Sequence, residues 1–285
     1  MILRGFDNDS ERKLPSLLIT AGIHGDEIGS MILLDLLADM FSKSDLKISV
    51  AFANYCNPDS IRHSQRQSVN ADLSDLNRGW ETKAVRQELE ELVKSFDLLL
   101  DLHCSRACTE HMLFNNGQNV NYEWLEKQGI PFAVREGPSD TLKMLADREG
   151  QLGMTWEMKG MQFPSEKAIK KSIDVIFGKI LGNWKDFAKN AYNAGSEAKN
   201  LMPEQLMQAA VPRSEGLIKW RLEGMGLGEK VARNEELGKI VSICDGTVNE
   251  KICSPCAGTV ICVCSSYARP YEAVCFIQPK IETDF

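Results

Sequence analysis

Over the first two thirds of the chain, short apolar runs alternate with segments of helical periodicity, and no other feature limits the fold as strongly. Four apolar runs have the length of strands: residues 16–25, 46–54, 96–105 and 153–160. Segments with apolar residues at helical spacing follow or precede them: residues 28–42, 85–96 and 164–184. Largely apolar strands that alternate with helices indicate a parallel sheet covered on both faces. The sequence therefore predicts an α/β domain with a mostly parallel mixed sheet flanked by helices.

A second pattern begins beyond residue 195. The segment before it is polar, and short alternating runs with frequent glycine follow: residues 216–220, 229–243, 246–255, 257–265 and 273–279. Short strands joined by tight turns are typical of all-β units. The length of 285 residues also suits two domains. We therefore expect an α/β domain over residues 1–195 and a small C-terminal all-β domain over residues 203–285.

The charge balance and the absence of long apolar runs exclude several classes of partner. The chain has 33 Lys and Arg against 40 Asp and Glu, a formal net charge of −7. No basic surplus can neutralise phosphates, so we expect no nucleic-acid partner. No run approaches the ~20 apolar residues of a membrane span, and the N-terminal segment does not resemble a secretory signal. The nine scattered cysteines fit reduced thiols. We expect a cytoplasmic protein without a membrane partner; a homo-oligomer is compatible with the sequence.

A candidate metal site begins at the end of the first long apolar run. His24 and Glu27 are three residues apart in Gly-Ile-His-Gly-Asp-Glu, where a strand gives way to a helix. Imidazole nitrogen and carboxylate oxygen are ligands that Zn²⁺ accepts. The best third ligand is His103, because it ends another apolar run and open α/β sheets place their sites at such strand ends. Asp101 shares the face of His103 and is suited to orient its imidazole. A lone histidine is more often structural, but the combination favours a metal.

The loop after the second apolar run concentrates donors that suit a carboxylate. It contains Arg62, Arg66, Asn77 and Arg78. A guanidinium group binds a carboxylate in a planar, bidentate geometry, and the neighbouring amide adds a further donor. A long loop without secondary structure is more often functional than not. The alternative is a solvated turn with ordinary surface charges.

Glu157 lies on a short, mostly apolar strand. A buried glutamate is costly unless it is paired or used chemically, so Glu157 is a candidate general base and general acid. The alternative is a salt-bridged glutamate at a sheet edge. The remaining histidines, His63 and His111, have no comparable partners, and we expect structural roles for them, although His111 could edge the pocket.

In this order, the motifs resemble the succinylglutamate desuccinylase/aspartoacylase family of the zinc carboxypeptidase superfamily. They are Gly-x-His-Gly-Asp-Glu, Asn-Pro followed by Asp-Leu-Asn-Arg, Leu-x-Asp-Leu-His, and a glutamate-bearing strand before Pro-Ser-Glu. The resemblance covers residues 21–181, and the C-terminal β segment is similar to the small β domain of that family. It implies a zinc-carboxypeptidase-like fold with one Zn²⁺ per chain.

The resemblance also implies roles for individual residues. It implies that zinc is held by His24, Glu27 and His103. It implies that Arg66 polarises the scissile carbonyl and stabilises the oxyanion, and that Glu157 is the general acid and base.

The substrate residues carry over less directly. The resemblance implies that Asn77 and Arg78 hold a substrate carboxylate. Gly-Trp-Glu at residues 79–81 stands where family members often have an aromatic residue and Pro-Gly, and the spacing from Arg66 to Asn77 is longer than in the shortest members. Arg62 is therefore a second candidate for the oxyanion role. Arg148 is a candidate contact for a second carboxylate.

The sequence thus predicts a zinc-dependent amide hydrolase that removes an acyl group from an N-acylated amino acid or a similar small amide. One alternative is a metallocarboxypeptidase that acts on short peptides. Another is a non-catalytic binding protein with a vestigial site. Metal content separates the last alternative from the first two, and the reaction products separate those two from each other.

Overall fold

The computed structural model of this 285-residue chain describes most of the sequence. The described residues are 1–7, 14–67, 75–77, 87–105, 109–115, 120–135, 141–160, 162–191, 206–221, 228–263, 267–271 and 273–280. The chain divides into two compact units: unit 1 is Met1–Arg106, Glu110–Phe132 and Glu136–Asn200, and unit 2 is Ala107–Thr109, Ala133–Arg135 and Leu201–Phe285. The boundary expected between residues 195 and 203 lies outside the described residues and stays a prediction.

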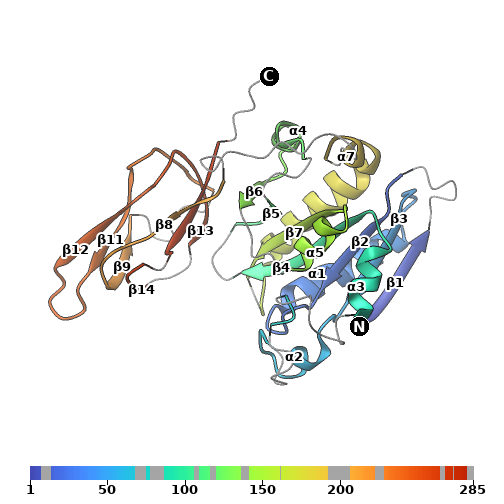
Figure 1. Cartoon of the computed structure of the whole chain (residues 1–285), viewed down its shortest axis with the longest axis horizontal. Helices are drawn as coiled ribbons and strands as arrows, with labels where there is room; N and C mark the ends of the chain where they lie inside the picture. Colours follow the sequence, from blue (N-terminus) through green and yellow to red (C-terminus); the bar gives the residue numbers. More distant parts are fainter. Residues whose placement is uncertain are drawn as a thin grey trace. The chain divides into compact units, whose positions relative to one another are not determined.

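A seven-stranded sheet forms the centre of the α/β fold (Figure 1), with the strand order β1-β3-β2-β4-β7-β5-β6. Its strands are β1 (Ile2–Asp7), β2 (Leu17–Ala21), β3 (Ser49–Asn54), β4 (Leu98–Ser105), β5 (His111–Asn115), β6 (Phe132–Arg135) and β7 (Leu152–Lys159). Strands β3, β2, β4 and β7 pair in parallel, whereas β1 and β5 pair antiparallel with β3 and β7. The predicted mostly parallel mixed sheet is confirmed.

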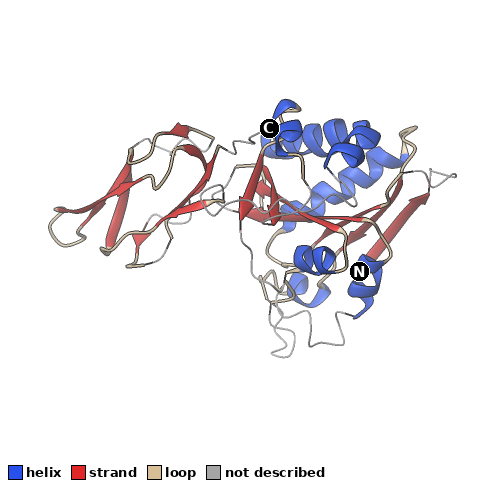
Figure 2. Cartoon of the chain, turned by 45° about the horizontal axis from the view of Figure 1, so that its top comes forward, coloured by secondary structure: helices blue, strands red, loops and turns tan. Residues whose placement is uncertain are grey.

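Helices cover both faces of this sheet (Figure 2). They are α1 (Ile28–Ser42), α2 (Pro58–Arg62), α3 (Gln87–Lys94), α4 (Tyr122–Lys127), α5 (Leu142–Arg148), α6 (Glu166–Ile173) and α7 (Trp184–Ala191). On one face, α3 and α5 bury Leu89 and Leu145 against Leu99 of β4. On the other, Trp156 of β7 donates a 3.0 Å hydrogen bond from Nε1 to Ser172 Oγ of α6. Two covered faces explain why the central strands read as continuous apolar runs.

Most predicted elements of unit 1 exist, with local differences. The helix expected at residues 28–42 has the same bounds as α1. Strand β2 is shorter than its apolar run because Gly22 has a φ of 75°, which ends the extended backbone. The helix expected over residues 164–184 begins as predicted, with the side chain of Ser165 as its N-cap. It then widens to a π-helix at Asp174–Ile180 and tightens to a 3₁₀ turn at Leu181–Asn183 before α7.

Unit 2 contains two four-stranded antiparallel sheets, with the orders β10-β13-β15-β8 and β12-β11-β9-β14. The strands are β8 (Gln208–Ala210), β9 (Gly216–Trp220), β10 (Lys230–Val231), β11 (Glu236–Val241), β12 (Val248–Cys253), β13 (Gly258–Val263), β14 (Tyr267–Ala268) and β15 (Cys275–Pro279). Their core includes Leu237, Ile240, Val260 and Ile277. The predicted all-β character of the C-terminal part is confirmed.

None of the helices in the described part of the chain has the length and apolar character needed to cross a membrane.

Candidate metal centre

The carboxyl ends of β2 and β4 lie side by side in the sheet, because these strands pair in parallel with Ala21 opposite Leu102. The turn after β2 carries His24 and Glu27, and β4 carries His103 near its end. Side chains that are 79 positions apart in sequence therefore reach the same edge of the sheet. This is the edge at which open α/β sheets place their sites.

The turn after β2 is held tightly against the segment that follows β3. The backbone N–H of Asn57 donates to Gly22 O at 2.8 Å, and its side-chain Nδ2 donates to Ile23 O at 3.2 Å. A Cβ at position 25 would lie 2.1 Å from the carbonyl carbon of Ser60, so the backbones approach closely only because Gly25 has no side chain. These contacts fix the direction in which the turn presents His24.

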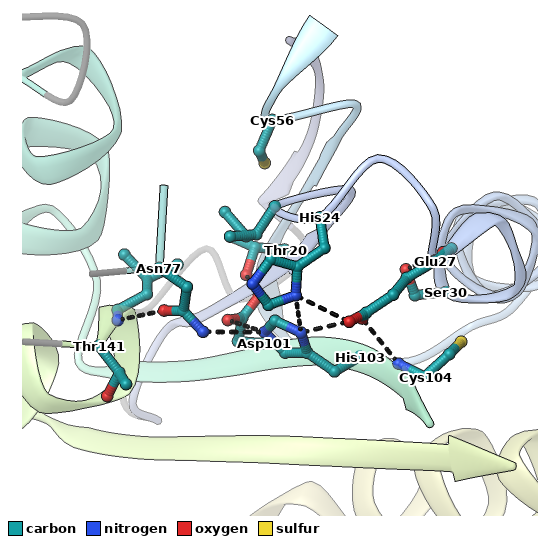
Figure 3. Close-up of polar contacts among 12 residues, drawn as sticks. Thr20, His24, Glu27, Ser30, Cys56, Asn77, Asp101, His103, Cys104 and Thr141 are labelled. Atoms are coloured by element: carbon teal, nitrogen blue, oxygen red, sulfur yellow. Dashed lines mark hydrogen bonds and ion pairs between the residues drawn. The ribbon is translucent and has the colours of Figure 1, made fainter. Parts of the chain in front are cut away.

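The side chains of His24, Glu27 and His103 point toward one another (Figure 3) and are almost fully buried. His24 Nδ1 lies 2.8 Å from Glu27 Oε1, and His103 Nδ1 lies 3.0 Å from Glu27 Oε2. The two Nδ1 atoms are 3.1 Å apart. The backbone N–H of Cys104 also donates to Glu27 Oε2 at 2.8 Å, which fixes the carboxylate. Three ligand atoms therefore converge on one small volume.

Carboxylates orient both imidazoles from outside the cluster. Asp101 Oδ2 lies 2.7 Å from His103 Nε2, and Asp75 Oδ1 lies 3.1 Å from His24 Nε2. The hydroxyl of Thr20 donates to Asp101 Oδ1 at 2.7 Å and holds that carboxylate in place. With a proton on each Nε2, both Nδ1 lone pairs face Glu27. The predicted contact between Asp101 and His103 is present.

This arrangement fits a divalent cation. Three acceptors that face one another without protons repel, and a cation between them removes the repulsion. Zinc takes imidazole and carboxylate ligands at about 2.0–2.2 Å, which places tetrahedral donor atoms roughly 3.3 Å apart. In the described part of the chain, His24, Glu27 and His103 form the group that could hold a metal ion, with ligand atoms within 4.8 Å of one another.

Without a cation, protons take its place. Burial lowers the pKa of His24, but hydrogen bonds to Asp75 and Glu27 outweigh burial and raise it. Burial opposes protonation of His103 as well, yet the charges of Asp101 and Glu27 hold its pKa well above the usual value. Burial raises the pKa of Glu27, but the facing imidazoles, His103 first, hold that pKa below its usual range. A metal ion therefore competes with protons for this cluster.

The segment 75–77 and Arg66 complete the polar surroundings. Arg66 is half-exposed, and its Nη1 lies 3.3 Å from Glu27 Oε1 while its Nε lies 3.5 Å from Asp75 Oδ2. Asn77 Nδ2 lies 3.4 Å from His103 Nε2, and Asn77 Oδ1 accepts the N–H of Leu142, the first residue of α5, at 2.8 Å. The structure thus brings Arg66 and Asn77 to the cluster.

Glu157 is placed by the pairing of β7 with β4. It is the direct partner of His103 in the parallel register, so both side chains leave the same face of the sheet. Glu157 is half-buried. The register thus sets a carboxylate beside the cluster from a separate strand.

The remaining predicted site residues are three arginines. Arg62 is exposed at the end of α2 and makes no hydrogen bond or ion pair with the cluster in the described part of the chain. Arg78 lies outside the described residues. Arg148 is exposed at the last residue of α5, roughly 9 Å along the helix axis from the end that touches Asn77.

Two residues near the site escaped the sequence analysis. Asp75 stands in the Asp-Leu-Asn-Arg motif, where only the asparagine and the arginine were given roles. Lys143, in the first turn of α5, is only 4% exposed. A Cβ at Gly153 of β7 would lie 2.2 Å from Lys143 O, which shows how closely α5 packs on the sheet. The motif contained a signal for Asp75, but no local pattern marks Lys143 as buried.

The fold and the cluster define an α/β protein with a candidate metal centre at the carboxyl ends of its parallel strands. The catalytic-domain model of the succinylglutamate desuccinylase/aspartoacylase family matches residues 13–178. The chain belongs to this family of deacylating hydrolases, and the resemblance predicted from the motifs is confirmed. Among curated proteins, none matches this chain.

Solved structures with the same fold include three bacterial proteins. A succinylglutamate desuccinylase/aspartoacylase from Rhodobacter sphaeroides has 17% identity and a TM-score of 0.69, with 94% of this chain and 86% of that chain covered. The product-bound ectoine utilization protein EutE (DoeB) from Ruegeria pomeroyi has 17% identity and a TM-score of 0.68, with 93% and 86% covered. An aspartoacylase family protein from Mesorhizobium loti has 18% identity and a TM-score of 0.63, with 95% and 87% covered.

The contact of Asp75 with His24 leads to a first prediction. Asp75→Asn removes the negative charge that faces the imidazole of His24, and we expect the affinity for zinc to fall by about 10- to 100-fold. Titration of the metal-free protein with zinc against a competing chelator measures this change. Asp39→Asn, on the exposed face of α1, is the matched control and should leave the affinity unchanged. Equal zinc affinities in the wild type, Asp75→Asn and Asp39→Asn would contradict the orienting role of Asp75.

Proposed function

We propose that this protein is a zinc-dependent deacylase that hydrolyses the amide bond of an N-acylated amino acid or a similar small amide. The convergence of His24, Glu27 and His103 in a buried cluster carries the proposal. Membership of the family supports the type of reaction, since the family name denotes removal of acyl groups from acylated amino acids. The product-bound relative is described as an ectoine utilization protein, in keeping with a small substrate.

The metal and its ligands provide the first part of the chemistry. When bound by His24, Glu27 and His103, zinc supplies a Lewis acid that polarises a carbonyl and acidifies water. Asp101 and Asp75 keep the imidazoles in the ligand orientation. Cys104 N–H and Arg66 both contact the carboxylate of Glu27, so the ligand set is held before substrate arrives.

The chain's own residues carry the proton and the developing charge. Glu157 takes a proton from the attacking water and returns it to the departing amine nitrogen, which leaves a free carboxylic acid and a free amine. Arg66 is half-exposed beside the cluster, so its guanidinium can donate to the carbonyl oxygen as negative charge develops there.

The amino-acid half of the substrate requires a cation for its carboxylate. Asn77 accepts a hydrogen bond from the N–H of Leu142 at the start of α5, and Lys143 is the next residue of that helix. The side chain of Lys143 is almost fully buried in the first turn of this helix, and a lysine is suited to pair with a carboxylate. We propose Lys143 for this role together with Asn77 and Arg78, since Arg148 lies at the far, exposed end of the helix.

The decisive experiment is amide hydrolysis by the zinc-loaded protein. N-acetyl, N-succinyl and other N-acyl amino acids and a few dipeptides are incubated with it, and free amine is measured before and after chelation. We expect release from one acyl series, loss of that release with the chelator, and recovery with zinc, because the acidified water depends on the metal.

The same panel separates the alternatives. Release from dipeptides alone would replace the deacylase with a metallocarboxypeptidase. A protein that binds no zinc and releases no amine would instead be a binding protein with a vestigial site. Activity that survives complete removal of the metal would contradict the proposed chemistry.

A second prediction concerns Glu157. Glu157→Gln keeps the size of the side chain but cannot move a proton, so kcat should fall by at least ~10²-fold while bound zinc stays at one per chain. Steady-state kinetics and metal analysis of the same sample measure both. Glu123→Gln, on the exposed side of α4, is the control. Near-normal turnover of Glu157→Gln would show that another group transfers the proton.

A third prediction compares two cations of α5. Lys143→Met preserves length but removes the charge, and KM for the best N-acyl amino acid should rise by roughly 10- to 100-fold. Arg148→Met at the exposed end of the helix should leave KM unchanged. If KM rises for Arg148→Met and stays unchanged for Lys143→Met, the substrate carboxylate is bound by Arg148 instead of Lys143.

A further inference from the structure

Glu157 is flanked by histidines on both sides in the sheet. In the parallel register with β4, Glu157 is opposite His103, and in the antiparallel register with β5 it is opposite His111. Directly opposite residues on neighbouring strands project from the same face. His103, Glu157 and His111 therefore form one row across three adjacent strands.

Side chains in such rows reach each other on this face. In the next row, two residues further back on β7, Thr155 is opposite Asp101, and Asp101 is opposite Thr20. The Thr20 hydroxyl donates to the Asp101 carboxylate at 2.7 Å across that row. Directly opposite Cβ atoms of an antiparallel pair are about 4.5–5.5 Å apart, a distance that imidazole and carboxylate groups span with a hydrogen bond.

His111 is also buried in a way that requires a polar partner. It is only 5% exposed, whereas His63 at the end of α2 is exposed. A buried imidazole carries at least one N–H, and leaving that donor without an acceptor is costly. The carboxylate of Glu157 is the acceptor that the register sets directly opposite it.

We propose that His111 is a positioning residue for Glu157, and this inference rests on the proposed function. An imidazole N–H of His111 donates to one carboxylate oxygen of Glu157 and holds the other oxygen toward His103 and the reacting water. His111 touches neither substrate nor metal. The hydrogen bond limits the rotamers of Glu157, so the group that moves the proton is already aimed when the substrate binds.

The test uses variants of His111 in the zinc-loaded protein. His111→Phe keeps a ring but has no donor, and kcat should fall by about 10- to 100-fold with KM unchanged. His111→Asn and His111→Gln place an amide donor near the positions of Nδ1 and Nε2, and one of them should restore much of kcat. Met112→Leu, the next residue of β5 with its side chain on the opposite face, should leave kcat and KM as they are.

Two further measurements separate this role from a merely structural one. Zinc content of the His111 variants should match that of the wild type, whereas His111→Phe should lower the free energy of unfolding, because it leaves the carboxylate of Glu157 without its donor. In a double-mutant cycle with Glu157→Gln, the effects of His111→Phe on kcat and on the free energy of unfolding should be strongly non-additive, because both substitutions remove the same hydrogen bond.

The results distinguish this inference from the proposed function. If the wild-type protein releases no amine from any compound of the panel, the proposed deacylase function is wrong. Additive unfolding free energies in the cycle overturn the contact between His111 and Glu157, whatever the panel shows. A rise in KM alone would make His111 a substrate contact, and loss of zinc without rescue by either amide would make it a support of the metal centre; each result overturns the positioning role.

Discussion

The convergence of three buried acceptors at one edge of the sheet is the constraint on which the site depends. Two imidazole nitrogens and a carboxylate, from His24, His103 and Glu27, face each other at about 3 Å, and such a group is stable only with protons or a cation between them. Carboxylates behind the imidazoles, Asp75 and Asp101, set the ring orientation. The polar groups around the cluster therefore form one electrostatic unit rather than separate contacts.

The backbone makes this unit possible. Parallel pairing brings the ends of β2 and β4 together. The turn that carries two of the acceptors can pack closely against Ser60 only because Gly25 has no side chain. The same register aligns Glu157 with His103 from the next strand. Most side chains of the cluster are thus carried by strands and by a short turn with fixed backbone contacts. Such elements hold the orientation of side chains better than a long loop does.

The sequence predicted the parts of this protein that depend on local information. Apolar runs marked the buried central strands, helical periodicity gave the bounds of α1, and the spacing of His24 and Glu27 pointed to one face of one turn. The order of motifs pointed to the family. Edge strands were less visible: all six residues of β1 are exposed or only half-buried, so no apolar pattern marked it as part of the sheet.

Contacts across long sequence separations were decided by the tertiary structure. The sequence alone determined which residue types could serve as ligands, acids and cations, and that the chain has α/β and all-β parts. It did not determine that Asp75 would meet His24, that Lys143 would be buried, or that His111 would lie opposite Glu157. Strand register and helix packing fix those neighbours, and both arise from the summed burial of many side chains, which no local pattern encodes.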